Sequence, residues 1–326
     1  MKLVKNIFLI ILIGSLTVVA ALSFYVRKEM KRPNELTDYQ IFEIKNGESL
    51  QNIASRLKAR DIIKSDLIFM AGVTLERKTL SFGYYQLPPR ASIIDVIKLI
   101  AGGKSIVYKV TIPEGWRAEQ IAQLLSERKI VGYSDFLLSA QDLEGKLFPD
   151  TYYFAPGSDA SKIVQMMNND YAERTKNLSV SDTDLIIASI VEREAVKDEE
   201  RPLIAGIYKN RIARKMKLEA DPTVQFGKDS NEIIGLSSSK IVSSFKFWRP
   251  ITLADYQTVD SDYNTYLISS LPPGPICNPG LKSIEATINY QKHDYLYFLQ
   301  NGGAIYPAKS VTEHNKNRVN ILGAKL

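Results

Sequence analysis

The most apolar stretch of the chain lies near its N-terminus. Residues 7–26, IFLIILIGSLTVVAALSFYV, contain no charged side chain. A helix of this length, at about 1.5 Å per residue, covers the roughly 30 Å hydrocarbon core of a bilayer. A cleavable signal peptide is the alternative, but its apolar core usually spans only about 7–15 residues and ends at a small-residue cleavage site. The pattern therefore predicts a short cytoplasmic tail at 1–6 and a transmembrane helix at 7–26.

The basic residues on either side of this stretch do not settle its orientation. Lys2 and Lys5 precede it, and four basic residues between 27 and 32 follow it. By the positive-inside rule this distribution argues against export of the C-terminal part, yet a long domain can cross regardless of nearby charge. The lone Cys277 suits an exported chain and a bacterial cytoplasm equally. We expect a single-pass protein of the cytoplasmic (inner) membrane, with the rest of the chain outside the cytoplasm.

The first half of the chain repeats one short pattern. The segments IKNGESLQNIASRL (44–57) and IPEGWRAEQIAQLL (112–125) match at an offset of 68 residues. Each is typical of a strand (39–44 and 107–112), a glycine turn and an amphipathic helix. In the first copy the helical spacing is kept by Leu50, Ile53, Ala54 and Leu57. The sequence thus predicts two small β-turn-α units.

The first unit resembles a LysM module, whose usual pattern is a strand, a polar turn with Gly-Asp/Glu-Ser/Thr-Leu, and a helix with Ile-Ala. The segment NGESLQNIA (46–54) fits that pattern. LysM modules bind glycans that contain N-acetylglucosamine, such as peptidoglycan and chitin, so the resemblance implies glycan contact here. The alternative is a common structural unit that only packs a scaffold.

In the second half of the chain, a glutamate stands where a core residue is expected. After Ser181 or Asp182, either of which can cap a helix, the pattern predicts a helix from about 184 to 196. At about 100° per residue, Glu194 falls in the middle of the apolar arc of this helix, and Glu192 falls towards its flank. The arc contains Ile187, Ile190 and Val191.

The chemistry of Glu194 depends on whether its carboxyl group is sheltered from water. A carboxyl held among apolar side chains is penalised in its charged form, so its pKa rises and it keeps a proton near neutral pH. A general acid that cleaves a glycosidic bond needs this property. The alternative is that the helix ends near residue 194 and the side chain turns into solvent, and periodicity alone leaves both open.

Composition and charge narrow the classes of function. The chain has 326 residues, of which 45% are hydrophobic and 24% charged, which is enough apolar mass for two globular domains. Its net charge of +6 is spread along the chain without a basic stripe, so we expect no nucleic-acid binding. Two histidines and one cysteine make a His/Cys metal site hard to build, so we expect no metal and no cofactor.

Three segments of the second half carry long, specific motifs. They are IIASIVEREAVKDEERPLIAGIYKNRIARKMKLEADPTVQFG (186–227), YNTYLISSLPPGPICNPG (263–280) and YLYFLQNGG (295–303). Together with the apolar stretch and the LysM-like unit, they resemble the YceG-like family of bacterial endolytic transglycosylases over nearly the whole chain. The resemblance implies an enzyme of the inner membrane that cuts nascent peptidoglycan strands within the chain, leaves a 1,6-anhydro-N-acetylmuramoyl end and terminates glycan elongation. Peptidoglycan strands would be its substrate, and peptidoglycan synthases are possible partners that the resemblance suggests.

The resemblance also implies a catalytic residue. The catalytic glutamate of the family lies in a Glu-x-Glu pattern, here Glu192-Arg193-Glu194. Lysozyme-like transglycosylases place the acid at the end of a helix, before Ser, Thr or Ala, which matches Glu194 followed by Ala195. Glu194 is therefore the predicted acid, and Glu192 is a supporting or substrate-contacting residue and the alternative acid. The implied mechanism needs one carboxyl group, no water and no metal.

Other polar residues are expected to line the cleft. The segment ADPTVQFG (220–227) supplies a turn and side chains that can hydrogen-bond sugar hydroxyls. The segment YNTY (263–266) supplies an amide and aromatic rings of the kind that sugars contact. The proline-rich loop LPPGPICNPG (271–280) is either part of the cleft or a structural corner. The predicted substrate-binding residues are Glu192, Asp221, Thr223, Gln225, Tyr263, Asn264 and Thr265.

One departure from the family pattern lies near the C-terminus. Relatives often carry a Gly-x-His-x-Phe strand before an His-Asn pair, whereas this chain has GGAIYPAKSVTEHN (302–315). Ala304 stands in the place of that histidine and Tyr306 in the place of the phenylalanine. A role for a histidine at this position therefore does not carry over, while the assignment of Glu194 is unaffected.

We expect an α+β protein: behind the single transmembrane helix, a LysM-like subdomain at 38–108, a second small unit at 109–143 and a lysozyme-like mixed catalytic domain at 144–326. The predicted function is a membrane-anchored endolytic lytic transglycosylase that cleaves the bond between N-acetylmuramic acid and N-acetylglucosamine. The alternatives are a hydrolytic muramidase and a catalytically silent peptidoglycan-binding scaffold for cell-wall synthases. Such a scaffold gains nothing from a costly carboxyl on an apolar helix face.

Overall fold

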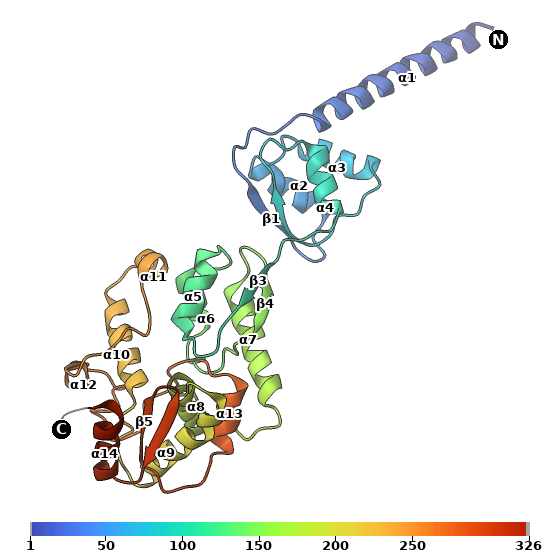
Figure 1. Cartoon of the computed structure of the whole chain (residues 1–326). Coiled ribbons are helices and arrows are strands. Elements are labelled where there is room, and N and C mark those ends of the chain that lie inside the picture. Colours follow the sequence, from blue (N-terminus) through green and yellow to red (C-terminus); the bar gives the residue numbers. More distant parts are fainter. Residues whose placement is uncertain (1, 324–326) are drawn as a thin grey trace. The chain divides into compact units, whose positions relative to one another are not determined.

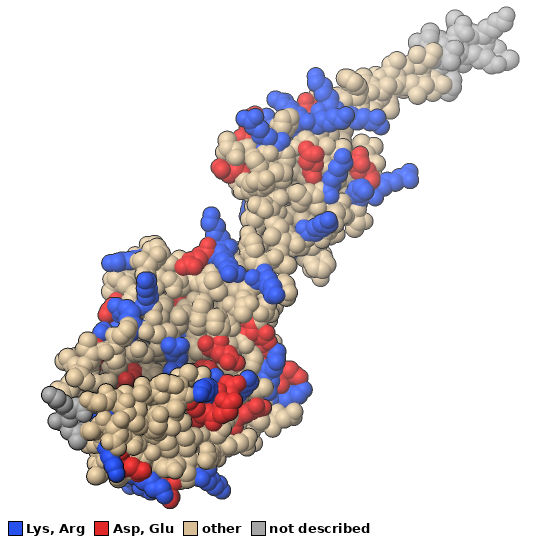
Figure 2. All heavy atoms as spheres, viewed as in Figure 1, with Lys and Arg blue, Asp and Glu red and all other residues tan. Residues whose placement is uncertain are grey.

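The computed structural model describes residues 2–323 of the chain, with side chains from residue 12 onward. The protein is a mixed α/β chain that divides into two compact units, Met1–Tyr108 (unit 1) and Lys109–Leu326 (unit 2) (Figure 1). The described strands form three two-stranded sheets. On the face shown in Figure 2, basic side chains are interspersed with acidic ones over both units, in keeping with the spread of charge along the sequence.

The helices and strands follow one another as short elements. Those of unit 1 are α1 (Lys2–Met30), β1 (Gln40–Ile44), α2 (Leu50–Ala59), α3 (Asp66–Leu75), β2 (Gly83–Leu87) and α4 (Ile93–Ala101). At the boundary and into unit 2 come β3 (Tyr108–Thr111), α5 (Ala118–Glu127), α6 (Tyr133–Ser139), β4 (Thr151–Phe154) and α7 (Ala160–Thr175). The chain continues with α8 (Asp182–Glu194), the short 3₁₀ helix η1 (Asp198–Glu200), α9 (Arg201–Ala213), α10 (Asp221–Ile234), α11 (Ser238–Ser244) and α12 (Asp255–Thr258). It ends with α13 (Leu281–Ile288), β5 (Tyr297–Asn301), β6 (Ala304–Ala308) and α14 (Val311–Leu322).

Helix α1 covers the predicted transmembrane stretch, but the structure does not support the predicted span. Within the described part of the chain, no helix combines the length and the apolar character needed to cross a bilayer. The side chains of residues 7–11 of the predicted span lie outside the described residues. At the other end of α1, Met30 is buried in the core of unit 1.

Unit 1 is built around the first predicted β-turn-α pattern. Gly47 turns the chain after β1 with a φ of 73°, a conformation that glycine adopts without strain, and Ser49 caps α2. β1 pairs antiparallel with β2, so that Phe42 stands opposite Tyr85. Both rings are buried in one core with apolar side chains of α2, α3 and α4. The predicted strand, turn and helix are confirmed here, and the glycan-binding role of this unit stays a prediction.

The second copy of the pattern opens unit 2. Gly115 turns the chain between β3 and α5 with a φ of 76°. Helix α5 packs against α6, which packs against α7, around a core that includes Phe136 and Leu147. The residues predicted as a second small unit (109–143) and those predicted as the catalytic domain (144–326) belong to this one compact unit.

Helix α8 is the central helix of the C-terminal half of unit 2. Predicted at about 184–196, it begins at Asp182 and ends at Glu194, with Ser181 as its cap. Helices α9 and α13 both pack against it (Figure 1). All seven side chains from Leu185 to Val191 are buried. The helix is therefore enclosed by protein over two turns, rather than exposed along a polar face.

The proline-rich loop at 271–280 supports α8. The hydroxyl of Ser189, which is fully buried, accepts a hydrogen bond from the N–H of Ile276 at 3.0 Å. The thiol of Cys277 donates to the carbonyl of Ser189 at 3.2 Å. These contacts hold the loop directly on the helix backbone.

Asn278 connects the same loop to two more segments. Its side-chain oxygen accepts from the N–H of Leu147 at 2.9 Å, and its amide nitrogen donates to the carbonyl of Trp116 at 3.0 Å. Because this side chain is fully buried, each of these bonds replaces one that water would have made. Of the two alternatives for this loop, the contacts favour the structural corner.

Replacing Ser189 with alanine should lower the free energy of unfolding of unit 2 by about 1–3 kcal/mol, because the buried N–H of Ile276 loses its acceptor. Trp116 and Trp248 are the tryptophans of the chain and both lie in unit 2, so urea unfolding followed by tryptophan fluorescence reports on this unit. Ser243→Ala, at an exposed position of α11, is the control and should stay within about 0.5 kcal/mol of the wild type. Equal stability of S189A and the wild type would contradict the supporting role of the loop.

Candidate active site

Glu194, the last residue of α8, lines a cavity of about 550 Å³ in unit 2. The chain leaves the helix at Ala195 in an extended conformation. Gln300 of β5 donates a hydrogen bond to the backbone carbonyl of Glu194 at 3.1 Å, and the carboxylate of Glu200 accepts one from the N–H of Val196 at 3.2 Å. The end of α8 is therefore held in place. The helix does end at residue 194, but its last side chain faces the cavity.

The cavity is lined by side chains from α8, α9, α10, α12, β5 and α14 and from the loops between them. Its volume lies in the range typical of small-molecule sites. Its lining combines aromatic, acidic and basic groups, among them Tyr208, Tyr256, Tyr266, Tyr297, Glu194, Glu219, Asp221, Arg211, His314 and Arg318. Rings and hydrogen-bonding groups in this mixture suit a sugar, which has apolar faces and polar edges.

The carboxyl of Glu194 has an environment that favours its protonated form. The side chain is partly buried, and the hydroxyl of Tyr208 donates to Oε1 at 3.2 Å. Burial raises the pKa of Glu194 to about 7, and the negative charge of Asp221 acts in the same direction. The hydrogen bond from Tyr208 and the charge of Arg193 lower this pKa. Near pH 7 the group is therefore present in both protonation states.

Tyr208 was not found from the sequence. It lies on α9 and is buried. Burial raises the pKa of Tyr208 well above its usual value, so its hydroxyl keeps its proton and acts as a donor to Glu194. The chain has 17 tyrosines, and nothing local distinguishes this one. Only the packing of α9 against α8 brings it to the carboxyl.

Asp221 is the predicted substrate-binding residue that the structure brings to the same cavity as Glu194. It is the first residue of α10. Its carboxylate accepts hydrogen bonds from the hydroxyls of Tyr266 at 2.7 Å and Tyr256 at 3.2 Å. The two rings lie 4.2 Å apart between centroids. Asp221 thus carries a positioned carboxylate that raises the pKa of Glu194 by its charge.

Thr223 and Thr265 are buried and position Asp221 without lining the cavity. Their hydroxyl oxygens are 2.8 Å apart. Thr265 also accepts from the N–H of Ala220 at 2.9 Å, directly before Asp221. The pair therefore joins the start of α10 to the segment 263–266.

Asn264 is buried as well and joins the segments that carry Tyr256 and Tyr266. Its amide nitrogen donates to the carbonyl of Tyr256 at 3.2 Å, and its oxygen accepts from the N–H of Tyr266 at 3.1 Å. The amide predicted to bind sugar is therefore engaged with the backbone of the protein.

The structure places Glu192 away from the cavity that Glu194 lines. Its Oε1 pairs with the guanidinium of Arg201 at 3.1 Å, and its Oε2 accepts from the N–H of Gly280 at 2.9 Å. The side chain is almost fully buried, at 6% exposure. Glu192 thus links α8 to α9 and to the proline-rich loop, and each of its oxygens has a partner within the protein.

Gln225 and Tyr263 also lie outside this cavity. Gln225 donates to the carbonyl of Arg249 at 3.1 Å. The ring of Tyr263 packs against that of Phe226, with 4.5 Å between centroids. Both predicted residues therefore contribute to the packing of α10.

Glu144 is a second carboxyl with a raised pKa, and geometry separates it from Glu194. Burial, together with the charge of Glu119, raises the pKa of Glu144 to about 8. Its oxygens accept from the N–H of Ala118 at 2.9 Å and from the side chain of Asn278 at 2.7 Å. It is not among the residues that line the Glu194 cavity. A raised pKa alone would not have distinguished the two carboxyls.

Arg211 and His314 form the basic side of the cavity. Arg211 is buried, pairs with Glu219 at 2.9 Å and donates to three backbone carbonyls. The ring of His314 stacks on Tyr297 with 5.6 Å between centroids. Burial lowers the pKa of His314, and the charges of Arg318 and Arg211 lower it further. A histidine therefore does reach the cavity, from α14 rather than from the strand that holds Ala304.

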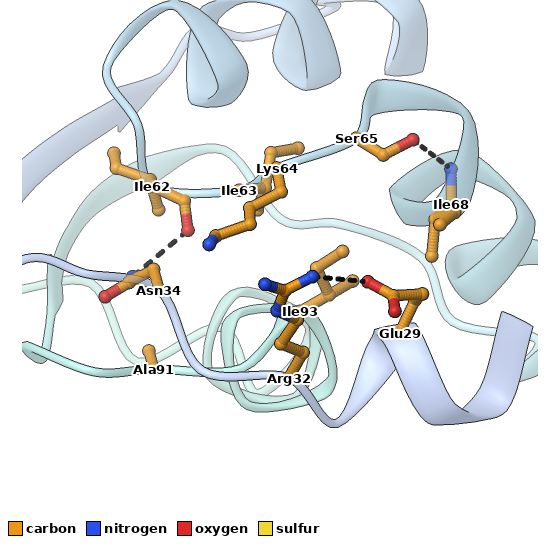
Figure 3. A pocket seen from close by; sticks show the side chains of 10 residues that line it. All are labelled: Glu29, Arg32, Asn34, Ile62, Ile63, Lys64, Ser65, Ile68, Ala91 and Ile93. Atoms are coloured by element: carbon orange, nitrogen blue, oxygen red, sulfur yellow. Dashed lines mark hydrogen bonds and ion pairs between the residues drawn. The ribbon is translucent and has the colours of Figure 1, made fainter.

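A much smaller cavity lies in unit 1 (Figure 3). Its volume is about 20 Å³, enough for one water-sized molecule and far too small for a sugar ring. Its polar groups are paired within the protein: Asn34 donates to the carbonyl of Ile62 at 3.1 Å, and Arg32 lies 3.6 Å from Glu29. This cavity gives no support to glycan binding by the LysM-like unit.

Comparisons with known proteins point to one family. The model of the YceG-like family matches residues 42–320. An endolytic murein transglycosylase of Bacillus subtilis is 30% identical over 324 aligned residues, covering 86% of this chain and 84% of the relative. An endolytic murein transglycosylase of Streptococcus pneumoniae is 28% identical, covering 88% of this chain and 59% of the relative. A crystal structure of a putative yceG-like protein from Listeria monocytogenes matches 86% of this chain and 99% of that chain, with 30% identity and a TM-score of 0.53.

Glu194→Gln should stabilise the protein in a pH-dependent way. Because the folded-state pKa of Glu194 is raised from 4.5 to about 7, the wild type loses stability as pH rises through this window, whereas glutamine does not titrate. The difference in free energy of unfolding between E194Q and the wild type should grow by roughly 1–3 kcal/mol from pH 4.5 to pH 8. Urea unfolding at several pH values measures it, with Glu199→Gln on exposed η1 as the control. A difference that does not change with pH would show that the carboxyl is not sheltered.

Proposed function

The chain belongs to the YceG-like family, and we propose that it is a peptidoglycan lytic transglycosylase with Glu194 as its single acid and base. The observation that carries this proposal is the Glu194 carboxyl in a cavity of about 550 Å³, with a pKa raised to about 7. A residue that first donates and then accepts a proton works best with a pKa near the working pH. The relatives named endolytic murein transglycosylases support the choice of substrate.

In the proposed reaction, Glu194 donates its proton to the oxygen that links C1 of N-acetylmuramic acid to N-acetylglucosamine. The C1–O bond breaks, its electron pair stays on that oxygen, and the N-acetylglucosamine end leaves with a new hydroxyl. The ionised Glu194 then takes the proton from the C6 hydroxyl of the muramoyl residue as O6 bonds to C1. The product is a 1,6-anhydro-muramoyl end, the carboxyl is protonated again, and no water is consumed.

The neighbours of Glu194 have supporting roles in this reaction. Tyr208 holds Oε1, and among the described residues nothing hydrogen-bonds to Oε2, which leaves that oxygen for the linking oxygen of the sugar. The negative charge of Asp221 stabilises the positive charge that develops at C1 in an oxocarbenium-like transition state. Its hydrogen bonds to Tyr256 and Tyr266 keep it oriented.

Finer aspects of the function belong to the same proposal. We propose that cleavage is endolytic and acts on nascent strands, which limits their length, and that peptidoglycan synthases supply those strands. The acid at the end of a buried helix supports a lysozyme-like catalytic domain. Since peptidoglycan lies outside the cytoplasmic membrane, unit 2 should act there, and digestion of unit 2 by protease added to intact protoplasts would test this placement.

Glu194→Gln should reduce release of anhydro-muramoyl products by at least about 10²-fold, because glutamine cannot donate the proton. Mass spectrometry of sacculi digested with the full chain measures these products. Glu199→Gln removes an equal charge from an exposed position and should leave the yield unchanged. Full release of anhydro products by E194Q would refute Glu194 as the acid.

Asp221→Asn should shift the pH dependence of cleavage. The proton donor is lost as pH rises through the pKa of Glu194, so kcat/KM should fall above about pH 7. The charge of Asp221 raises that pKa, so its removal should move the falling limb to lower pH. Measured pH profiles of the wild type and D221N test this, and coincident limbs would contradict the coupling of the two groups.

The second carboxylate in the cavity also makes a hydrolytic muramidase a candidate. Glycosidases that hydrolyse use a pair of carboxyl groups, and Glu194 and Asp221 line one cavity. Digestion in ¹⁸O-labelled water separates the two reactions. A transglycosylase incorporates no label and leaves anhydro ends, whereas a muramidase leaves labelled reducing ends.

A further inference from the structure

Arg193, the residue before the proposed acid, is a partly buried cation without an acidic partner. Its Nε is buried and has no hydrogen-bond partner, and no described carboxylate forms a salt bridge with its guanidinium. The guanidinium carbon lies 4.1 Å from the centroid of the Trp248 ring. Its contact with the protein is thus an aromatic face rather than an anion.

Other buried arginines of unit 2 behave differently. Each pairs with a carboxylate: Arg117 with Glu119 at 2.7 Å, Arg201 with Glu192 at 3.1 Å and Arg211 with Glu219 at 2.9 Å. Arg249, which is partly buried like Arg193, pairs with Asp229 at 2.9 Å. Arg193 is therefore the exception among these groups.

An unpaired guanidinium at such a position is costly. Removing a charge from water without a compensating partner is unfavourable. Burial lowers the pKa of Arg193 for the same reason. Its sequence neighbour Glu192 does not remove the cost, since both of its oxygens are engaged by Arg201 and Gly280. An anion brought by a ligand would supply the missing partner.

The ring that backs Arg193 is held in place by the protein. Trp248 has a φ of 61°, a backbone conformation that is uncommon for a bulky residue. Its N–H donates to Asp229 at 2.7 Å and its indole N–H to Gln120 at 2.7 Å, so the ring is fixed. At Gly115 a Cβ would lie only 3.3 Å from Nη1 of Arg193, so glycine at this position avoids crowding the guanidinium.

This cation lies close to the proposed catalytic group. Arg193 precedes Glu194 and its charge lowers the pKa of Glu194, although neither Arg193 nor Trp248 lines the Glu194 cavity. A peptidoglycan strand bound at Glu194 carries carboxylates on its muramic acid residues. These belong either to the attached peptide or, where the peptide is absent, to the lactyl group itself.

We infer that Arg193, backed by Trp248, binds a carboxylate on the side chain of a muramic acid residue of the strand that Glu194 cleaves. This inference rests on the proposed function, because it takes the ligand to be a peptidoglycan strand. The indole covers one face of the guanidinium, and the N–H groups of the guanidinium donate hydrogen bonds to the two carboxylate oxygens. The subsite adds recognition of the acidic substituent to the cleavage chemistry of Glu194.

The test measures binding in the full-length Glu194→Gln chain, so that no cleavage is needed. Calorimetry compares three glycan oligomers: one with peptides and free carboxylates, the same one with its carboxylates amidated, and a peptide-free one with the lactyl carboxylate. Arg193→Gln in this background should weaken binding of a carboxylate-bearing oligomer by roughly 10- to 100-fold and leave the amidated one unchanged. Arg193→Lys, which keeps the charge without the planar fork, should lose less. Arg214→Gln, an exposed arginine, is the matched control and should bind as the background does.

Each outcome decides the inference. If Arg193→Gln weakens binding of the peptide-bearing oligomer alone, the peptide carboxylate is the ligand. If it weakens binding of the peptide-free oligomer, the lactyl carboxylate is the ligand. Equal loss for free and amidated oligomers, or no loss at all, overturns the subsite. The proposed function fails by a different result, namely release of anhydro products by E194Q, which does not depend on Arg193.

Discussion

The shelter of one carboxyl group at the end of an enclosed helix is the constraint on which the candidate site depends. Two turns of α8 are buried on all sides, so the helix delivers its last residue inside unit 2 rather than at the surface. Gln300 and Glu200 hold the turn that follows Glu194, and the proline-rich loop holds the helix through Ser189. Because charge is disfavoured there, the pKa of Glu194 rises to about 7.

The side chains of residues 192–194 leave α8 in different directions and therefore have different partners. Successive side chains point about 100° apart, so each meets a different environment. Glu192 meets a cation and a backbone N–H and becomes a structural link. Arg193 meets an indole ring, and Glu194 meets a neutral tyrosine hydroxyl. A neutral donor orients the acid without fixing it as an anion, which a cation in the same place would do.

The cavity is assembled from segments that are far apart in the chain. The start of α10 brings Asp221, α9 brings Tyr208, and α14 brings His314. Residues that do not touch the cavity determine this assembly: Thr223 and Thr265 join the start of α10 to the loop that carries Tyr266. Polar residues that the sequence suggested as sugar-binding thus position the residues that line the cavity.

The sequence alone determined the features that arise from local interactions. The turns at Gly47 and Gly115, the cap at Ser181 and the apolar arc that singles out Glu194 all depend on residues within a few positions of one another. The apolar stretch at 7–26 did predict a helix, but within the described residues no helix is long and apolar enough to cross a membrane.

Only the tertiary structure decided which polar residues face the cavity. Whether Glu192, Gln225 or Asn264 meets a ligand or a backbone group depends on what packs against it from distant segments, and periodicity carries no information about those partners. The same holds for Tyr208, which long-range packing brings to Glu194. Local order follows from neighbouring residues, whereas the partners of a buried polar group are set by the whole fold, because most such groups are hydrogen-bonded to atoms that are distant in the sequence.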